Sequence, residues 1–261
     1  MNLSTVSVHG DRFQIEVLTG GQGRPIVYLH DEYLPPAASA WLDDLATRAR
    51  VIAPRHPGFG GSTGLEHLDD LLDLVVYYLD FLDTMDLRTV DVIGESFGGM
   101  IAAEVASLAP ERVRRLVLVG SIGLWLDATP APDPFAWPAA DLHTLAWANP
   151  DGDAARTFLP DLGSDDEKRR STLERIQSLS AAAKFIWPIP DKGLRKRIHR
   201  LRAPTLLLWG SEDRLVPIAY GQEFNKLIPG SQLVAVSGAG HFPLLENPAD
   251  ALGILRKFLD G

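Results

Sequence analysis

Two periodicities alternate along the chain. Short runs rich in Val, Ile and Leu predict buried strands, and longer runs with apolar side chains at helical spacing predict helices. After an N-terminal hairpin over residues 3–19, we expect strands at 25–30, 51–53, 89–93, 113–119, 205–209 and 232–236. We expect helices at 38–49, 66–85, 100–108, 218–227 and 248–259. Strands that alternate with helices in this way indicate an α/β fold with a mostly parallel, doubly wound sheet.

The segment 66–85 has a pronounced two-sided pattern. Apolar side chains recur at helical spacing on one stripe, at Leu68, Leu72, Val75, Leu79 and Leu82. Carboxylates fall on the opposite stripe, at Asp69, Asp73, Asp80 and Asp83. We therefore expect one amphipathic helix that buries its leucine stripe. A solvated face is a better interpretation of the carboxylates than a metal cluster.

The alternation stops between residues 122 and 200, where no strand-like run occurs. Ser164 and Glu167 form a capping-box pattern that predicts a helix to about residue 184, and a further short helix is expected at 194–201. The charge changes as well, because residues 1–120 carry 17 acidic and nine basic side chains whereas residues 121–200 carry 11 of each. We predict a core formed by residues 1–121 and 201–261, with residues 122–200 as a helical insertion.

Composition narrows the classes of function. The 261 residues suffice for one large domain with a full apolar core. A net charge of −9 argues against nucleic acid as a partner, and no apolar run approaches the ~18 residues of a membrane span. We find no secretion signal at the N-terminus and expect a cytoplasmic protein, either a monomer or a homodimer. The absence of cysteine excludes disulfides, a thiolate nucleophile and cysteine-based metal sites.

One stretch, Gly94-Glu95-Ser96-Phe97-Gly98-Gly99, matches the pattern Gly-x-Ser-x-Gly between a predicted strand and a predicted helix. This is the context of a nucleophile elbow, in which a sharp turn exposes a serine hydroxyl at the end of a strand. A second match, Gly60-Gly61-Ser62-Thr63-Gly64, lies in a turn-rich loop with no strand directly before it and no helix directly after its serine. Ser96 is therefore the candidate nucleophile, and we expect Ser62 to be a loop residue.

A serine hydroxyl needs a base that takes its proton and a carboxylate that orients this base. Asp213 and His241 each follow a predicted strand, and parallel sheets place their sites past the carboxyl ends of strands. Glu212 is the less favoured acid, because a shift of one residue turns its side chain away, and we expect His30 to be structural. No zinc-type histidine pair, P-loop or dinucleotide fingerprint occurs, so we expect neither a metal nor a nucleotide cofactor.

Residues 94–99, 210–217 and 240–248 together resemble the α/β-hydrolase superfamily, and residues 56–62 resemble its loop after the fourth strand. The resemblance covers nearly the whole chain outside 122–200. It implies that Ser96 is the nucleophile, His241 the general base and Asp213 the orienting acid. It also implies that residues 122–200 form the helical cap that such enzymes insert after the sixth strand.

The sequence departs from the family in the loop after the third strand. This loop usually reads His-Gly-x, and its third residue donates a backbone N–H to the oxyanion of the reaction. Here it reads His30-Asp31-Glu32. By position, the resemblance implies that the backbone N–H groups of Glu32 and Phe97 form the oxyanion hole. The two acids leave the shape of the loop open and add carboxylates near the site.

The resemblance implies a cofactor-independent serine hydrolase that cleaves a carboxylic ester or a related small acyl compound through an acyl-enzyme. A carbon–carbon bond hydrolase of the meta-cleavage type is the alternative, since it uses the same triad, although the Gly-Pro-Gly-like anion loop is missing. A non-enzymatic receptor for a small ligand is a third hypothesis. Residues 122–200 hold four tryptophans, which we expect in the core of the cap or in the lining of the acyl pocket: Trp125, Trp137, Trp147 and Trp187.

Overall fold

The computed structural model describes residues 1–33, 40–157 and 164–261. In this part of the chain, eight strands form one sheet in the order β1-β2-β4-β3-β5-β6-β7-β8. The strands are β1 (Asn2–Val8), β2 (Phe13–Gly20), β3 (Pro25–Leu29), β4 (Arg50–Pro54), β5 (Val90–Glu95), β6 (Val113–Val119), β7 (Thr205–Gly210) and β8 (Gln232–Val236). Strand β2 pairs antiparallel with β1 and β4, and the other pairs are parallel, which confirms the predicted sheet.

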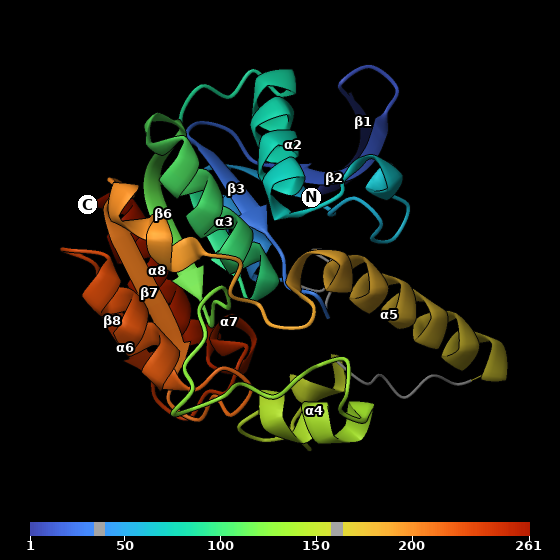
Figure 1. Cartoon of the computed structure of the whole chain (residues 1–261), viewed down its shortest axis with the longest axis vertical. Coiled ribbons are helices and arrows are strands. Elements are labelled where there is room, and N and C mark those ends of the chain that lie inside the picture. The colour runs from blue at the N-terminus through green and yellow to red at the C-terminus, as the bar shows by residue number, and fades with distance from the viewer. Residues whose placement is uncertain (34–39, 158–163) are drawn as a thin grey trace.

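Helices cover both faces of this sheet (Figure 1). One apolar cluster joins the sheet to α2 (Leu71–Thr84), α3 (Phe97–Leu108) and α6 (Ile218–Leu227), and a second joins it to α1 (Trp41–Ala46) and α8 (Pro248–Asp260). A short helix, α7 (Pro243–Glu246), precedes α8. The start of α8 is as predicted, because the Asn247 side chain accepts a hydrogen bond from the backbone N–H of Asp250. The start predicted for the helix at 38–49 includes residues outside the described part.

The segment 66–85 differs from its prediction. It divides into a 3₁₀ turn, η2 (Leu65–His67), and α2, whose N-cap Asp70 accepts hydrogen bonds from the N–H groups of Leu72 and Asp73 at 2.8 and 3.1 Å. The predicted stripe holds except at Leu72, which is 57% exposed, because Leu68, Val75 and Leu82 are buried and Leu79 packs against the core. Aromatic residues share the face that is buried, which consists of Leu71, Leu74, Val75, Tyr77, Tyr78, Phe81 and Leu82.

The part of residues 122–200 that the structure describes contains no strand, and we call residues 122–200 the cap segment. It holds α4 (Ala139–Ala146), η4 (Ala155–Thr157), α5 (Asp165–Ile186), η5 (Leu194–Lys196) and η6 (Ile198–Arg200). The capping box of Ser164 and Glu167 is confirmed, with hydrogen bonds in both directions. The helix predicted at 194–201 is instead two 3₁₀ turns that meet at Arg197, whose guanidinium pairs with Glu104 of α3.

Figure 1 shows α5 projecting away from the sheet, with α4 below it in this view. Only the C-terminal part of α5 is buried, at Ala181, Ala182, Phe185 and Ile186. No helix in the described ranges has the length and apolar character needed to cross a bilayer.

The parallel strands bring four loops to one edge of the sheet. The carboxyl ends of β3, β5, β7 and β8 lead into residues 30–33, Ser96, residues 211–217 and residues 237–241, respectively. In parallel sheets this edge is where binding and catalytic groups collect. All the residues predicted for the site lie on these loops or at the first residue of α3.

Candidate active site

Ser96 lies at a sharp turn between β5 and α3. Its backbone has φ 49° and ψ −112°, a region that non-glycine residues rarely occupy. The turn is held on both sides, because the Ser96 N–H donates to Val119 O at 2.9 Å and its carbonyl accepts from Met100 and Ile122. Strain that surrounding contacts enforce in this way is typical of functional residues.

Glycines allow the neighbouring backbone to approach this turn. A Cβ on Gly98 would lie 2.1 Å from the carbonyl oxygen of Leu29, and one on Gly94 would lie 2.5 Å from that of Gly98. Neither position has room for a side chain. Gly98 thus allows α3 to pack against the end of β3, and Gly94 allows β5 to pack against α3.

His241 and Asp213 form a buried pair. The Asp213 Oδ2 atom lies 2.9 Å from His241 Nδ1, and its Oδ1 atom accepts hydrogen bonds from the N–H groups of Leu215 and Val216 at 3.0 and 2.8 Å. The His241 backbone N–H donates to Ala146 O of α4, which ties the histidine loop to the cap segment. The carboxylate therefore fixes the ring so that Nε2 is the nitrogen left for chemistry.

Ser96 and His241 both pack against the end of β6. Val119 O accepts from the Ser96 N–H, and the next residue, Gly120, packs so closely that its Cβ would lie 3.0 Å from His241 Nδ1. Both side chains are fully buried. Ser96 Oγ and His241 Nε2 have no hydrogen-bond partner among the described residues. A buried polar atom without a partner calls for an explanation, and these two atoms belong to the predicted nucleophile and its predicted base.

The Phe97 N–H, one of the two predicted oxyanion donors, has a partner in this structure. It donates to the carboxylate of Glu32, with Phe97 N and Glu32 Oε2 3.2 Å apart. Glu32 is 2% exposed. A side-chain carboxylate therefore sits on the first N–H of α3, where the partial charge of a helix N-terminus favours an anion. The sequence pointed to the backbone of Glu32 and gave no signal for this role of its side chain.

A second carboxylate, Glu95, is buried beside the nucleophile. Its Oε2 accepts a hydrogen bond from Tyr28 Oη at 2.6 Å, and burial raises the pKa of Glu95 to about 7. Burial also acts to lower the pKa of His241, but the charge and hydrogen bond of Asp213, with added charge from Glu32 and Glu95, outweigh it and raise that pKa to about 9. In the free protein at neutral pH, His241 is thus mostly protonated.

Two other histidines brace the loop after β3. The His56 N–H donates to His30 Nε2 at 3.2 Å, and the His30 carbonyl lies 2.8 Å from His56 Nε2. Burial lowers the pKa of both rings, that of His56 to about 4. They are therefore neutral at physiological pH, and His30 has the structural role that we predicted. Asp31 shapes the same loop, because its Oδ1 accepts from the N–H of Tyr33 at 2.6 Å.

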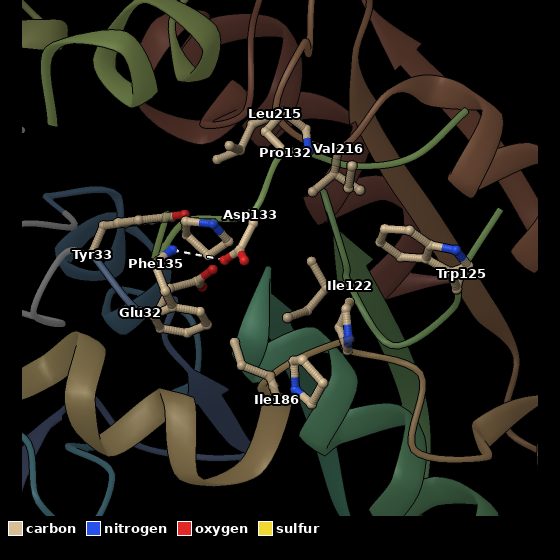
Figure 2. Close-up of a pocket in the computed structure, with 14 residues that line it drawn as sticks. Glu32, Tyr33, Ile122, Trp125, Pro132, Asp133, Phe135, Ile186, Leu215 and Val216 are labelled. Atoms are coloured by element: carbon tan, nitrogen blue, oxygen red, sulfur yellow. Dashed lines mark hydrogen bonds between the residues drawn. The ribbon is translucent and has the colours of Figure 1, made fainter. Parts of the chain in front are cut away.

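A cavity opens beside Glu32, between the sheet edge and the cap segment (Figure 2). It encloses about 530 Å³ of empty space, its open mouth included. Apolar and aromatic side chains make up most of its wall, among them Ile122, Trp125, Ile186 and Val216. This apolar and aromatic lining suits a small organic ligand.

A comparison with known families supports an assignment at this point. Residues 33–248 match the family model described as the alpha/beta hydrolase fold. The chain is an α/β-hydrolase. It is 28% identical over 253 residues to the 2-hydroxy-6-oxo-2,4-heptadienoate hydrolase of Pseudomonas putida, covering 92% of this chain and 90% of the relative.

Solved structures share the fold of this α/β-hydrolase. The meta-cleavage product hydrolase of Pseudomonas fluorescens IP01 superposes with a TM-score of 0.77 at 20% identity, covering 98% of this chain and 97% of the other. An esterase of Exiguobacterium antarcticum superposes with a TM-score of 0.78 at 17% identity, covering 99% of each chain. At these identities the likeness concerns the fold alone.

Within the α/β-hydrolase, the competing sequence candidates lie apart from this site. Ser62 Oγ accepts from the Glu16 N–H at 3.1 Å and donates to Arg55 O at 3.2 Å, as expected of a loop residue. Glu212 is exposed and lies beside Ser211, while Asp213 holds the histidine. No group of three or more potential metal-ligating side chains occurs in the described ranges.

The four tryptophans of the cap segment divide three ways. Trp147 is fully buried against Phe242, and Trp125 lines the cavity beside Glu32. Trp137 and Trp187 are 44% and 51% exposed, and neither expectation holds for them. A count of tryptophans therefore overstated the apolar lining.

Proposed function

We propose that this α/β-hydrolase is a cofactor-independent serine hydrolase that cleaves a carboxylic ester or a related small acyl compound. The observation that carries the proposal is the strained Ser96 next to the buried His241–Asp213 pair, with Ser96 Oγ and His241 Nε2 both unpaired in the described part of the chain. These are the parts of a serine nucleophile, its base and the acid that orients the base.

In the proposed reaction, Ser96 Oγ attacks the carbonyl carbon and His241 Nε2 takes the hydroxyl proton. Collapse of the tetrahedral intermediate breaks the bond to the leaving group, and His241 returns the proton to the departing oxygen. Water then attacks the acyl-enzyme with the same base, which releases the acid and restores Ser96. The oxyanion of each step would face the N–H groups of Phe97 and Glu32.

The Glu32 carboxylate must leave the Phe97 N–H before this donor can serve an oxyanion. A substrate carbonyl that enters the site therefore competes with an anion of the protein itself. Departure of Glu32 also removes one of the charges that raise the pKa of His241, so the histidine becomes a more available base. We propose that residues 122–200 act as the cap over this site, since α4 contacts the histidine loop and Trp125 and Ile186 line the cavity.

A second candidate is hydrolysis of a carbon–carbon bond, which the relatives favour. The Pseudomonas putida relative is named for a heptadienoate, and a solved neighbour is named for a meta-cleavage product. A dienoate carries a carboxylate, however, and the cavity here presents the carboxylates of Glu32 and Asp133. Repulsion between like charges makes the ester the better candidate.

A fluorophosphonate probe and a panel of p-nitrophenyl esters test the proposal. We expect the probe to label Ser96 and short-chain esters to be turned over, with both lost when His241 is replaced by Ala. Turnover of a dienone ring-cleavage product without turnover of esters would favour the second candidate. Absence of both labelling and turnover in a folded protein would indicate a receptor.

A further inference from the structure

The cavity beside Glu32 has an unusual combination of charges and rings. Two of its 14 lining residues are acidic, Glu32 and Asp133, and three are aromatic, Tyr33, Trp125 and Phe135. None of the described lining residues is Lys, Arg or His. Figure 2 shows Tyr33, Glu32, Phe135 and Asp133 on one side of the cavity and Trp125 across from them.

Aromatic faces and carboxylates attract the same kind of ligand. A cation above the face of Trp, Tyr or Phe is held by the negative charge of the ring face, most strongly where water is excluded. Substituted ammonium groups suit such a site because their charge is spread over an apolar surface. A carboxylate nearby supplies the counter-charge.

The two acids are held in place by different contacts. Asp133 Oδ1 accepts a hydrogen bond from the Phe135 N–H at 2.9 Å, which fixes its carboxylate in the turn that carries the aromatic ring. Glu32 is held by the Phe97 N–H. Arg175 of α5 acts electrostatically on Tyr33, but it is not one of the lining residues. The charge of the described lining itself is thus negative.

We propose that the cavity selects acyl substrates that carry an ammonium group, and that Glu32 pairs with this cation as the Phe97 N–H passes to the substrate oxygen. This inference rests on the serine hydrolase proposed above and names its substrate class. Release of the Phe97 N–H leaves a buried carboxylate without its hydrogen-bond donor, which is costly. A cation in the cavity offsets this cost, whereas a neutral substrate of the same shape does not. The cation therefore both binds in the cavity and frees the oxyanion donor.

Isosteric pairs of esters test the proposal, because replacing a quaternary nitrogen by carbon changes charge and little else. Acetylcholine is compared with 3,3-dimethylbutyl acetate, which places the cation on the alcohol side of the ester. Phenyl 4-(trimethylammonio)butanoate is compared with phenyl 5,5-dimethylhexanoate, which places the cation on the acyl side. We expect kcat/KM to favour the cation about tenfold or more in at least one pair. The preference should fall as salt screens the charges.

Variants of the cavity residues test which side chains cause the preference for the cationic ester. We expect Glu32→Gln and Asp133→Asn each to reduce the cation-to-neutral ratio severalfold, since both keep a carbonyl acceptor and lose the charge. Asp141→Asn removes an exposed charge of α4 outside the cavity, and this control should keep the wild-type ratio. Trp125→Leu should reduce the ratio while leaving an apolar wall.

A binding measurement separates this inference from the proposed hydrolase. Calorimetric titration with choline and with 3,3-dimethylbutanol needs no turnover, and we expect choline to bind at least about tenfold more tightly. The inference would be overturned if the cationic and the neutral ester of each pair had equal kcat/KM, or if the two alcohols bound equally. Ser96 labelling and neutral-ester turnover would still support the hydrolase in that case. Tight choline binding without labelling of Ser96 would instead retain the cation site and refute the hydrolase.

Discussion

The chain contains the same five-residue pattern twice, and the two copies use their residues for different purposes. In the loop copy, Gly60 and Gly64 have φ values of 53° and 97°, so glycine there supplies a backbone conformation. In the elbow copy, Gly94 and Gly98 have no positive φ and supply room for the neighbouring backbone. The positive φ belongs to Ser96 itself.

The serine hydroxyls differ in the same way. Ser62 Oγ makes two hydrogen bonds to backbone groups of Glu16 and Arg55, and these bonds join the loop to β2 and to the residue that follows β4. Ser96 Oγ makes none among the described residues, although it is fully buried. A hydroxyl whose bonds are satisfied is part of the structure, whereas a buried and unpaired one is available for chemistry. The pattern is identical, and the surroundings decide between the two roles.

The largest expected effect comes from replacing each serine by alanine in turn. Ser96→Ala should reduce ester turnover by about 10⁴-fold or more and abolish fluorophosphonate labelling, because no other group replaces the nucleophile. Ser62→Ala should keep the activity and lose about 1–2 kcal/mol of stability with its two hydrogen bonds. Steady-state kinetics and denaturant unfolding measure the two effects. Labelling that survives in Ser96→Ala would reverse the comparison.

The next largest effect is expected for Asp213, the acid that contacts His241. Asp213→Asn should reduce kcat by roughly 10³–10⁴-fold with the fold intact, since the His241 tautomer is no longer held. Glu212→Gln, one residue away and exposed, is the matched control and should retain its rate. If Glu212→Gln were inactive and Asp213→Asn active, the 2.9 Å contact with His241 would have no catalytic meaning.

The oxyanion donors give a smaller effect. Glu32→Pro removes the predicted second N–H donor and should reduce kcat by about 10²–10³-fold. Proline also restricts Asp31 before it, so thermal stability has to be measured alongside. Glu32→Ala removes the carboxylate and keeps the N–H, and its kcat should exceed that of Glu32→Pro. Equal kcat values for two equally stable variants would place the second donor elsewhere.

Replacing a glycine by alanine should destabilise the protein more in the elbow copy than in the loop copy. A Cβ on Gly98 meets the backbone oxygen of Leu29, which has no way to move aside, so Gly98→Ala should cost about 1–3 kcal/mol or more. A Cβ on Gly61 meets the carboxylate end of Glu16, a flexible side chain, at 2.6 Å. Gly61→Ala should therefore cost under about 1 kcal/mol. Urea unfolding of both variants measures the difference, and equal losses would contradict this account of the elbow.

The smallest expected effect is on pH dependence. The base must be neutral, and His241 has a pKa raised to about 9 in the free protein, so kcat/KM for a neutral ester should rise as the pH approaches 9. Glu32→Gln removes one of the charges that raise this pKa and should move the inflection to lower pH, with a gain in kcat/KM at pH 7 of less than about tenfold. An inflection that stays near 9 in Glu32→Gln would show that its carboxylate has no influence on the base.

The sequence by itself determined the strand order along the chain, the bounds of α6, the capping box at Ser164, the cap at Asn247 and the elbow context of Ser96. Each of these depends on the spacing or chemistry of residues close together in the chain, which a pattern contains. Tertiary structure decided that the aromatic residues Tyr78 and Phe81 of α2 lie in the core and that Leu72 does not. It also decided that the Glu32 carboxylate lies on the Phe97 N–H and that Asp133 and Trp125 face one cavity. The contact of Glu32 with Phe97 joins residues 65 positions apart, and it exists because the parallel strands β3 and β5 end at the same edge of the sheet.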